Sequence, residues 1–97
     1  MRREIRICGA GGQGVISIAN LLARCAVSSG LYAAQTQSYG PASRGGVSRG
    51  EVVLSDEPID YPFVQKPDIL VAMLQEAYDR FIGDVKEDTI IFIDPDL

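Results

Sequence analysis

Six residues between a predicted strand and a predicted helix form the first pattern that could do chemistry. Residues 9–14 read GAGGQG, and Gly9, Gly11 and Gly14 fit the spacing G-x-G-x-x-G. Glycines at the start of a helix let a phosphate approach the backbone N–H groups, and the helix dipole favours an anion there. The alternative is that the glycines only allow tight packing of strand against helix, and the pattern alone leaves both interpretations open.

The part of the dinucleotide fingerprint that should hold the ribose is absent. A dinucleotide site usually places an Asp or Glu about 20 residues beyond the glycines, but the sequence has no acidic residue from Ile5 to Gly50. The loop also lacks the G-K-[ST] of a Walker motif. NAD is therefore disfavoured, and NADP keeps only weak support through Arg44.

A second glycine-rich segment, residues 38–46, reads SYGPASRGG. Its glycines open unusual backbone dihedrals and its proline fixes one; these residues are Gly40, Pro41, Gly45 and Gly46. The stiff turn presents Tyr39 beside Arg44, whose planar guanidinium suits a carboxylate or a phosphate. From chemistry alone, a structural ion pair of Arg44 with an acid such as Asp56 or Asp60 is the favoured alternative.

The residues needed for nucleophilic or metal chemistry are scarce. Histidine is absent, which removes the Ser-His and Cys-His mechanisms and the commonest metal ligand. The two cysteines, Cys8 and Cys25, are expected to be small buried hydrophobic residues, and no C-x-x-C offers ligands for zinc or an iron–sulfur cluster. We therefore expect no catalytic residue and no metal site in this chain, and a role in binding and positioning.

Three other features each have a functional and a structural interpretation. The acids of residues 56–60 suit a paired-carboxylate site or, more simply, a solvated turn around a proline. Residues 61–63, Tyr-Pro-Phe, suit a docking patch or a small satellite core. The acids of residues 94–96 could hold a metal, although two acids in a turn are a poor ligand set.

Charge is divided unevenly along the 97 residues. Residues 1–50 carry six arginines against one acid, a net charge of +5, whereas residues 51–97 carry a net charge of −9. The first half is the better place for an anionic ligand, and the acidic half argues against nucleic acid as a partner. No signal peptide and no apolar stretch long enough to span a membrane is apparent, so we expect a cytoplasmic protein without membrane contact.

Periodicity predicts alternating strands and helices. Strands are expected at residues 4–8, 31–37, 47–55, 68–74 and 89–94, and helices at residues 13–29 and 75–85. The first helix is apolar nearly all round except for one polar stripe, so it should be buried on most sides, against the sheet and a partner. The stripe contains Ser17, Asn20, Arg24 and Ser28. The strands at 68–74 and 89–94 are continuous apolar runs and are expected to be buried.

This order of elements predicts a three-layer α/β/α Rossmann-like domain. Its sheet should be mostly parallel and can be mixed by one antiparallel strand. Residues 1–97 form one domain in this interpretation. Because no helix follows the strand at 89–94, the sequence predicts a domain truncated at its C-terminus, or one that a partner completes.

Four segments, in this order, resemble one known family. GAGGQGV, SYGPASRGG, EVVLSDEPIDYP and PDILVAM are similar to segments of the gamma subunit of the 2-oxoacid:ferredoxin oxidoreductases, a domain that also occurs in the fused pyruvate enzyme and in indolepyruvate oxidoreductase. The resemblance covers nearly the whole chain. The SDEPIDYP segment looks most like the 2-oxoglutarate branch.

The resemblance implies a subunit of a thiamine diphosphate-dependent enzyme. Such an enzyme converts 2-oxoglutarate, pyruvate or a related 2-oxoacid, with coenzyme A, into acyl-CoA, CO2 and reduced ferredoxin. In this family, thiamine diphosphate is held mainly by the alpha and beta subunits, and iron–sulfur clusters lie in beta or in a ferredoxin-like delta subunit. The gamma chain binds no cofactor alone, is expected to be inactive in isolation, and is implicated in the access of coenzyme A.

The resemblance also carries over a set of site residues by position. In the glycine loop these are Gly9, Gly11, Gly12, Gln13 and Gly14, and in the turn Ser38, Tyr39, Gly40, Pro41, Arg44, Gly45 and Gly46. They are expected to face the phosphates of coenzyme A or a neighbouring subunit. Ala42 stands where many members carry an acid, so the role of that position does not carry over. The alternatives are an indolepyruvate oxidoreductase subunit, a free-standing NADP-binding protein, and loops that serve only as subunit interface.

Overall fold

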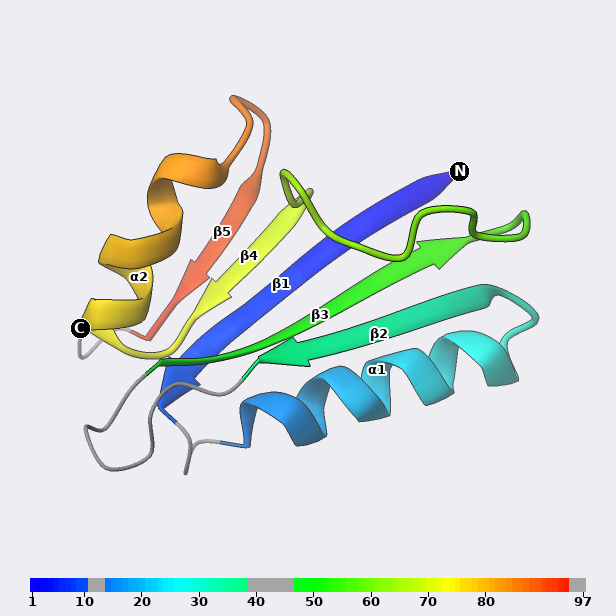
Figure 1. The fold of residues 1–97 in the computed structure, drawn as a ribbon, viewed down its shortest axis with the longest axis horizontal. Helices are drawn as coiled ribbons and strands as arrows, with labels where there is room; N and C mark the ends of the chain where they lie inside the picture. The colour runs from blue at the N-terminus through cyan, green and yellow to red at the C-terminus, as the bar shows by residue number, and fades with distance from the viewer. Residues whose placement is uncertain (11–13, 39–46, 95–97) are drawn as a thin grey trace.

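Strand β1 (Arg2–Ala10) lies at the middle of a five-stranded sheet (Figure 1). The computed structural model describes residues 1–10, 14–38 and 47–94. The other elements follow in chain order as α1 (Val15–Ser28), β2 (Tyr32–Ser38), β3 (Val47–Ser55), β4 (Ile69–Ala72), α2 (Gln75–Phe81), the 3₁₀ turn η3 (Ile82–Asp84) and β5 (Ile90–Ile93). Every predicted strand and helix is present, although β1 is longer and β4 is shorter than predicted.

The sheet is mixed, with strand order β2-β3-β1-β4-β5. Strand β3 is antiparallel to β1 and β2, whereas β4 is parallel to β1 and β5 is parallel to β4. Four strands thus point the same way, which confirms the predicted mostly parallel sheet. The connections through α1 and α2 move in opposite directions along the sheet and place their helices on opposite faces. They therefore share one hand, as the strong preference for right-handed crossovers requires.

Alternation along β1 divides the core into two layers. Ile5 and Ile7 face α1 and pack with its Val15 and Ala19. Cys8 faces α2, and the buried residues around it are Val47, Leu70, Ala72, Ala77 and Phe81. Ala77 and Phe81, four residues apart in α2, both face this layer, and the two helices with the sheet between them form the predicted three layers.

Gly50 sets how closely α1 approaches the sheet. A Cβ atom at this position would lie 2.8 Å from the Cβ of Ala19 and 3.2 Å from the carbonyl oxygen of Val15. Glycine inside a strand is costly unless a neighbour approaches closely, and here the helix does. The missing side chain therefore lets α1 pack against β3.

The prediction of a buried strand at residues 89–94 is wrong. Strand β5 forms an edge of the described sheet, and its four apolar side chains are 39–57% exposed. Beside it, β4 is buried on the α2 face through Leu70 and Ala72, but only half-buried on the other face at Ile69 and Val71. Helix α1 packs mainly on β2 and β3. An apolar run indicates a preference for burial, but it does not say which element covers the strand.

Helix α1 buries one face rather than most of its surface. Its buried residues are Val15, Ala19 and Ala26, and its exposed large apolar residues are Ile18, Leu21 and Val27. Cys25 is exposed as well, so the expectation that this cysteine is buried is wrong. The predicted polar stripe is exposed, and apolar side chains flank it on the outer surface of the helix.

Candidate site at the carboxyl end of the sheet

The two glycine-rich segments leave the sheet from neighbouring positions. Strand β1 ends at Ala10, which pairs with Val47 at the start of β3, and β2 ends at Ser38, which pairs with Arg49 of β3. The glycine loop follows Ala10, and the turn joins Ser38 to Val47. The carboxyl end of an open α/β sheet is the usual place for a ligand, and the described residues bring the anchors of both segments together there.

Three of the predicted site residues are described. Gly9 and Ser38 are strand residues rather than loop residues, because β1 and β2 continue through them: Gly9 pairs with Ser48, and Ser38 pairs with Arg49. Gly14 precedes α1. The other predicted site residues lie outside the described residues; they are Gly11, Gly12, Gln13, Tyr39, Gly40, Pro41, Arg44, Gly45 and Gly46.

Gly14 starts α1 in a conformation that glycine adopts without steric cost. Its φ is 75° and its ψ is 21°, in the left-handed region, and its carbonyl accepts a hydrogen bond from the N–H of Ile18 at 2.9 Å. No side chain caps this helix start, and the first turn contains no acidic residue. The first N–H groups of a helix have no partner within the helix, so this end favours an anion.

A charged cluster lies on the α2 face of the same sheet. Arg6 of β1 and Glu51 of β3 are paired in register, and Arg6 Nε donates a hydrogen bond to Glu51 Oε2 at 2.5 Å. The two residues are only 4% and 6% exposed. Arg6 also donates to the carbonyl oxygen of Val64 at 3.1 Å and lies 3.9 Å from the carboxylate of Asp84. Because these contacts occupy the charge of Arg6 inside the protein, we assign the pair a structural role.

Arg49 is the cation of this cluster that solvent can reach. Its guanidinium carbon lies 5.6 Å from the centre of the Phe81 ring, and its Nε lies 3.8 Å from the second carboxylate oxygen of Glu51. The side chain is 37% exposed. Since it shares that carboxylate with Arg6, Arg49 keeps donors for another anion. Arg49 is thus a candidate binding residue that the sequence analysis missed.

A local signal for this residue exists in the sequence. Alternation along VSRGEVV places Arg49 and Glu51 on one face of a strand. Arg6 interrupts the apolar run of the first strand in the same way. What the sequence cannot supply is the register between the two strands, which brings these side chains together.

Cys8 lies in the same layer but is not suited to act as a nucleophile. Burial raises the pKa of its thiol to about 11, and the positive charges of Arg6 and Arg49 offset this only in part. Its Sγ lies 3.4 Å from the carbonyl oxygen of Val71. The thiol is therefore protonated at neutral pH and packs as a small apolar group, as predicted.

The acids of residues 56–60 behave as solvated turn residues. All three are exposed, and Asp56 accepts a hydrogen bond from the N-terminal ammonium group of Met1 at 2.8 Å. The suggested pairing of Asp56 or Asp60 with Arg44 lies outside the described residues. Tyr61 and Phe63 are each 50% exposed and meet edge to face at 5.5 Å. This exposure rules out the satellite core for these two rings.

Neither a metal-binding cluster nor a membrane-spanning helix is present in the described ranges. Among residues 1–10, 14–38 and 47–94, no three His, Cys, Asp or Glu side chains lie close enough to hold a metal ion. The helices in those ranges are too short, or too polar, to cross a membrane.

Comparisons with known proteins agree with the predicted resemblance. The family model for pyruvate ferredoxin/flavodoxin oxidoreductase matches residues 4–97. The chain is 57% identical over 98 residues to the 2-oxoglutarate synthase subunit KorC of Methanothermobacter marburgensis, with 100% of this chain and 53% of that protein covered. The chain thus spans about half the length of the curated relatives it matches.

Solved structures point the same way. The gamma subunit of a keto/oxoacid ferredoxin oxidoreductase from Geobacter sulfurreducens superposes with a TM-score of 0.86 at 45% identity, over 100% of this chain and 53% of that one. A 2-oxoglutarate:ferredoxin oxidoreductase from Magnetococcus marinus, solved with 2-oxoglutarate, coenzyme A and succinyl-CoA, gives a TM-score of 0.89 at 26% identity, over 97% of this chain and 16% of that one. The chain belongs to the pyruvate ferredoxin/flavodoxin oxidoreductase family, and it is similar to the gamma subunits of that family along its whole length.

Proposed function

We propose that this chain acts as a gamma-type subunit of a 2-oxoacid:ferredoxin oxidoreductase, with 2-oxoglutarate as the 2-oxoacid. The observation that carries the proposal is the similarity to 2-oxoglutarate synthase subunits over the full 97 residues. The enzyme would convert the 2-oxoacid and coenzyme A into acyl-CoA and CO2 and pass the electrons to ferredoxin.

Within that complex, this chain binds and positions rather than reacts. Its thiol at Cys8 is protonated, its buried charges at Arg6 and Glu51 are paired, and the sequence has no histidine. Thiamine diphosphate and the iron–sulfur clusters would be held by the alpha, beta and delta subunits, in the cytoplasm. This division of labour leaves the gamma chain to shape the approach of coenzyme A.

The carboxyl end of the sheet is the part that would meet coenzyme A. Two described features, on opposite faces of this end of the sheet, support an anion there: the uncapped start of α1 behind Gly14 and the partly exposed guanidinium of Arg49. In the sequence, Arg44 falls between Ser38, which pairs with Arg49, and Val47. Phosphate groups suit such a combination of backbone N–H groups and guanidinium forks. The loop and turn residues named above would line this surface.

The role of Arg44 can be tested in the assembled complex. Arg44→Ala should raise the KM for coenzyme A by about tenfold, the usual scale for one charge-assisted contact to phosphate. Calorimetric titration with coenzyme A and a turnover assay measure this. Arg80→Ala removes an exposed arginine from α2 and is the matched control. Coenzyme A affinity and turnover that both stay unchanged in Arg44→Ala would contradict the assigned role.

A second candidate is that the loops serve only as subunit interface, which the exposed Ile18 and Leu21 on α1 favour. Gly14→Asp and Gly14→Asn distinguish the two candidates, because both residues tolerate the left-handed conformation and only Asp repels a phosphate. A coenzyme A response weakened in Gly14→Asp but kept in Gly14→Asn supports the coenzyme A surface. Loss of co-purification with the other subunits in both variants supports the interface.

A further inference from the structure

Strand β2 is an edge of the described sheet that lacks the usual protection. It pairs with β3 without a bulge from Tyr32 to Ser38, and no described strand lies on its other side. Its sequence, YAAQTQS, contains no charged residue and no proline. Natural edge strands are usually blunted by such residues, by bulges or by being short. The outward N–H and C=O groups of β2 are therefore available to another strand.

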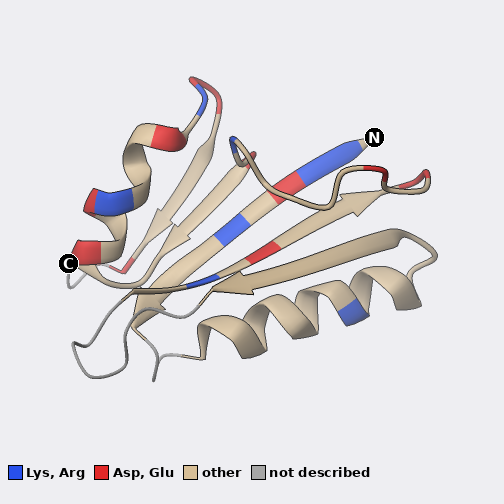
Figure 2. Ribbon diagram, in the orientation of Figure 1, with Lys and Arg blue, Asp and Glu red and all other residues tan. Residues whose placement is uncertain are grey.

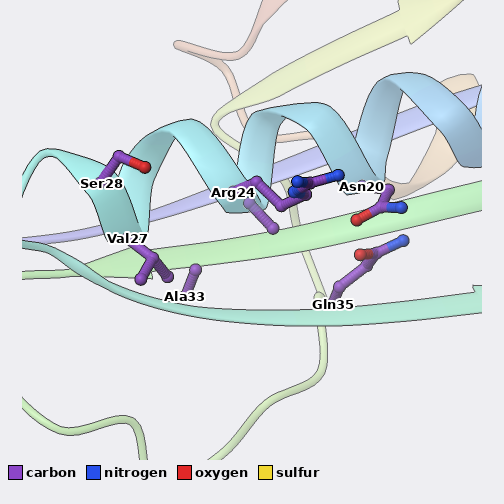
Figure 3. Close-up of a pocket in the computed structure, with 7 residues that line it drawn as sticks. Asn20, Arg24, Val27, Ser28, Ala33 and Gln35 are labelled. Carbon is purple, nitrogen blue, oxygen red and sulfur yellow. The ribbon is translucent and has the colours of Figure 1, made fainter.

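A groove runs between β2 and α1, with a volume of about 460 Å³ (Figure 3). Asn20 of α1 and Gln35 of β2 point toward each other at one end, and Val27 and Ala33 face each other farther along (Figure 3). Ala33 and Gln35 face α1 because they pair with Leu54 and Val52, which pack in the α1 layer. The groove thus combines an apolar part with two side-chain amides.

Arg24 gives this groove its charge. It is the single charged residue of α1, seen as one blue band on that helix in Figure 2, and it lines the groove. It makes no ion pair with any residue in the described part of the chain, and the undescribed segments 11–13 and 39–46 contain no acid. An exposed guanidinium beside amide groups suits an incoming carboxylate.

We propose that β2 and this groove dock an extended segment of another subunit, which adds a strand to the sheet and places an acidic side chain against Arg24. An added strand would lie about 4.8 Å beyond β2 and point alternate side chains to the α1 face. Those side chains enter the groove beside Ala33 and Gln35. The proposal rests on the proposed function, since it takes the partner from the oxidoreductase complex.

Charge disfavours β2 of a second copy as the occupant. Pairing β2 with β2 of a second copy would bring two Arg24 side chains to the same seam, and neither β2 nor α1 carries an acid. Like charges set opposite each other are destabilising. The partner segment must therefore bring the acid, which a different polypeptide can do.

Hydrogen exchange of the complex against the free chain tests the strand addition. Alternate amides of an antiparallel edge strand point away from its neighbour, so about half of the β2 amides should gain protection on assembly. Arg24→Glu should weaken assembly by about tenfold or more, and Arg24→Lys should keep most of it. Arg80→Glu, an equal charge reversal on an exposed position of α2, should have no effect.

The possible failures are distinguishable. A complex that assembles and turns over while the β2 amides stay unprotected overturns this inference and leaves the proposed function intact. Equal effects of Arg24→Glu and Arg80→Glu overturn it as well. β2 amides protected in a homodimer of the free chain assign the edge to a second copy and contradict the proposed partner. A chain that never joins the other subunits overturns the proposed function and this inference together.

Discussion

The centre of the sheet and its β5 edge differ in how far their side chains are buried. At the centre, β1 and β3 bury even a charged pair, Arg6 and Glu51. At the edge, β5 leaves four consecutive apolar side chains 39–57% exposed. The buried ion pair of Arg6 and Glu51 therefore has a structural role in this chain. We propose that the β2 edge and the carboxyl end of the strands are the surfaces that meet other molecules.

Glu51→Leu, at the centre of the sheet, is expected to lower the free energy of unfolding most. It leaves the guanidinium of Arg6 buried without its hydrogen-bonded carboxylate, and removing one partner of a buried pair costs about 3–5 kcal/mol. Urea denaturation of the purified chain measures the loss. The double variant Arg6→Met/Glu51→Leu should recover most of it, because replacing both partners with apolar residues is often neutral. A single variant as stable as the wild type would show that the pair is not structural.

The two cysteines allow the reactivity of a buried thiol in the sheet to be compared with that of an exposed thiol on α1. With its pKa raised to about 11, Cys8 has a thiolate fraction at pH 8 about a hundredfold below that of an ordinary thiol, and burial blocks access besides. Cys25 is exposed. We expect one thiol per native chain to react with Ellman's reagent and two in urea. Cys25→Ser is the control, and a fast native reaction in that variant would show that Cys8 is accessible.

Gly50→Ala tests the close approach of α1 to β3. The added methyl group would lie 2.8 Å from the Cβ of Ala19, so the helix must shift. Overpacking of this kind typically costs about 1–3 kcal/mol. Gly83→Ala is the matched control, because a Cβ there meets nothing within 4 Å. Equal denaturation midpoints for the two variants would mean that Gly50 does not set the packing distance.

The smallest effect on stability is expected at the periphery of the sheet, where Lys86 forms an ion pair with Asp68. Burial alone would raise the pKa of Asp68, but hydrogen bonds from Lys86 and the Glu4 amide and the charge of Lys86 outweigh it and hold the pKa below its ordinary value of 3.8. The ionised carboxylate therefore stabilises the fold above pH 3.8, and this contribution disappears as the pH falls through the lowered pKa. The pair is partly exposed and solvent screens it, so the contribution is small.

Asp68→Asn isolates that contribution. Denaturation midpoints of the wild type and Asp68→Asn should differ near pH 6 and converge as the pH falls well below 3.8. A difference that persists unchanged at low pH would mean that Asp68 acts through packing rather than through its charge.

Local sequence patterns predict much of the fold. The bounds predicted for β3 agree with the structure, because a glycine pair precedes the strand and a segment rich in acids and prolines follows it. Helix α1 begins at Val15, two residues after its predicted start, and the buried positions of α2, Ala77 and Phe81, lie at helical spacing. These features depend on residues close in sequence, where propensity and periodicity act.

The prediction errors arise where contacts between residues far apart in the sequence determine burial or pairing. Arg6 and Glu51 are 45 residues apart, and only the β1–β3 register joins them. The apolar run of β5 predicts a buried strand, yet its exposure depends on which elements lie beside it. Cys25 follows the apolar pattern of α1, but the sheet covers only one face of that helix. For the site, the sequence identified both glycine-rich segments but did not reveal Arg49.

Subunit omission tests most directly whether this chain completes an oxidoreductase. The complex is reconstituted from separately purified subunits with and without this chain, and 2-oxoglutarate-dependent reduction of ferredoxin is followed with coenzyme A present. Acyl-CoA formation and ferredoxin reduction are expected only when this chain is present. Equal rates in its absence would contradict this expectation.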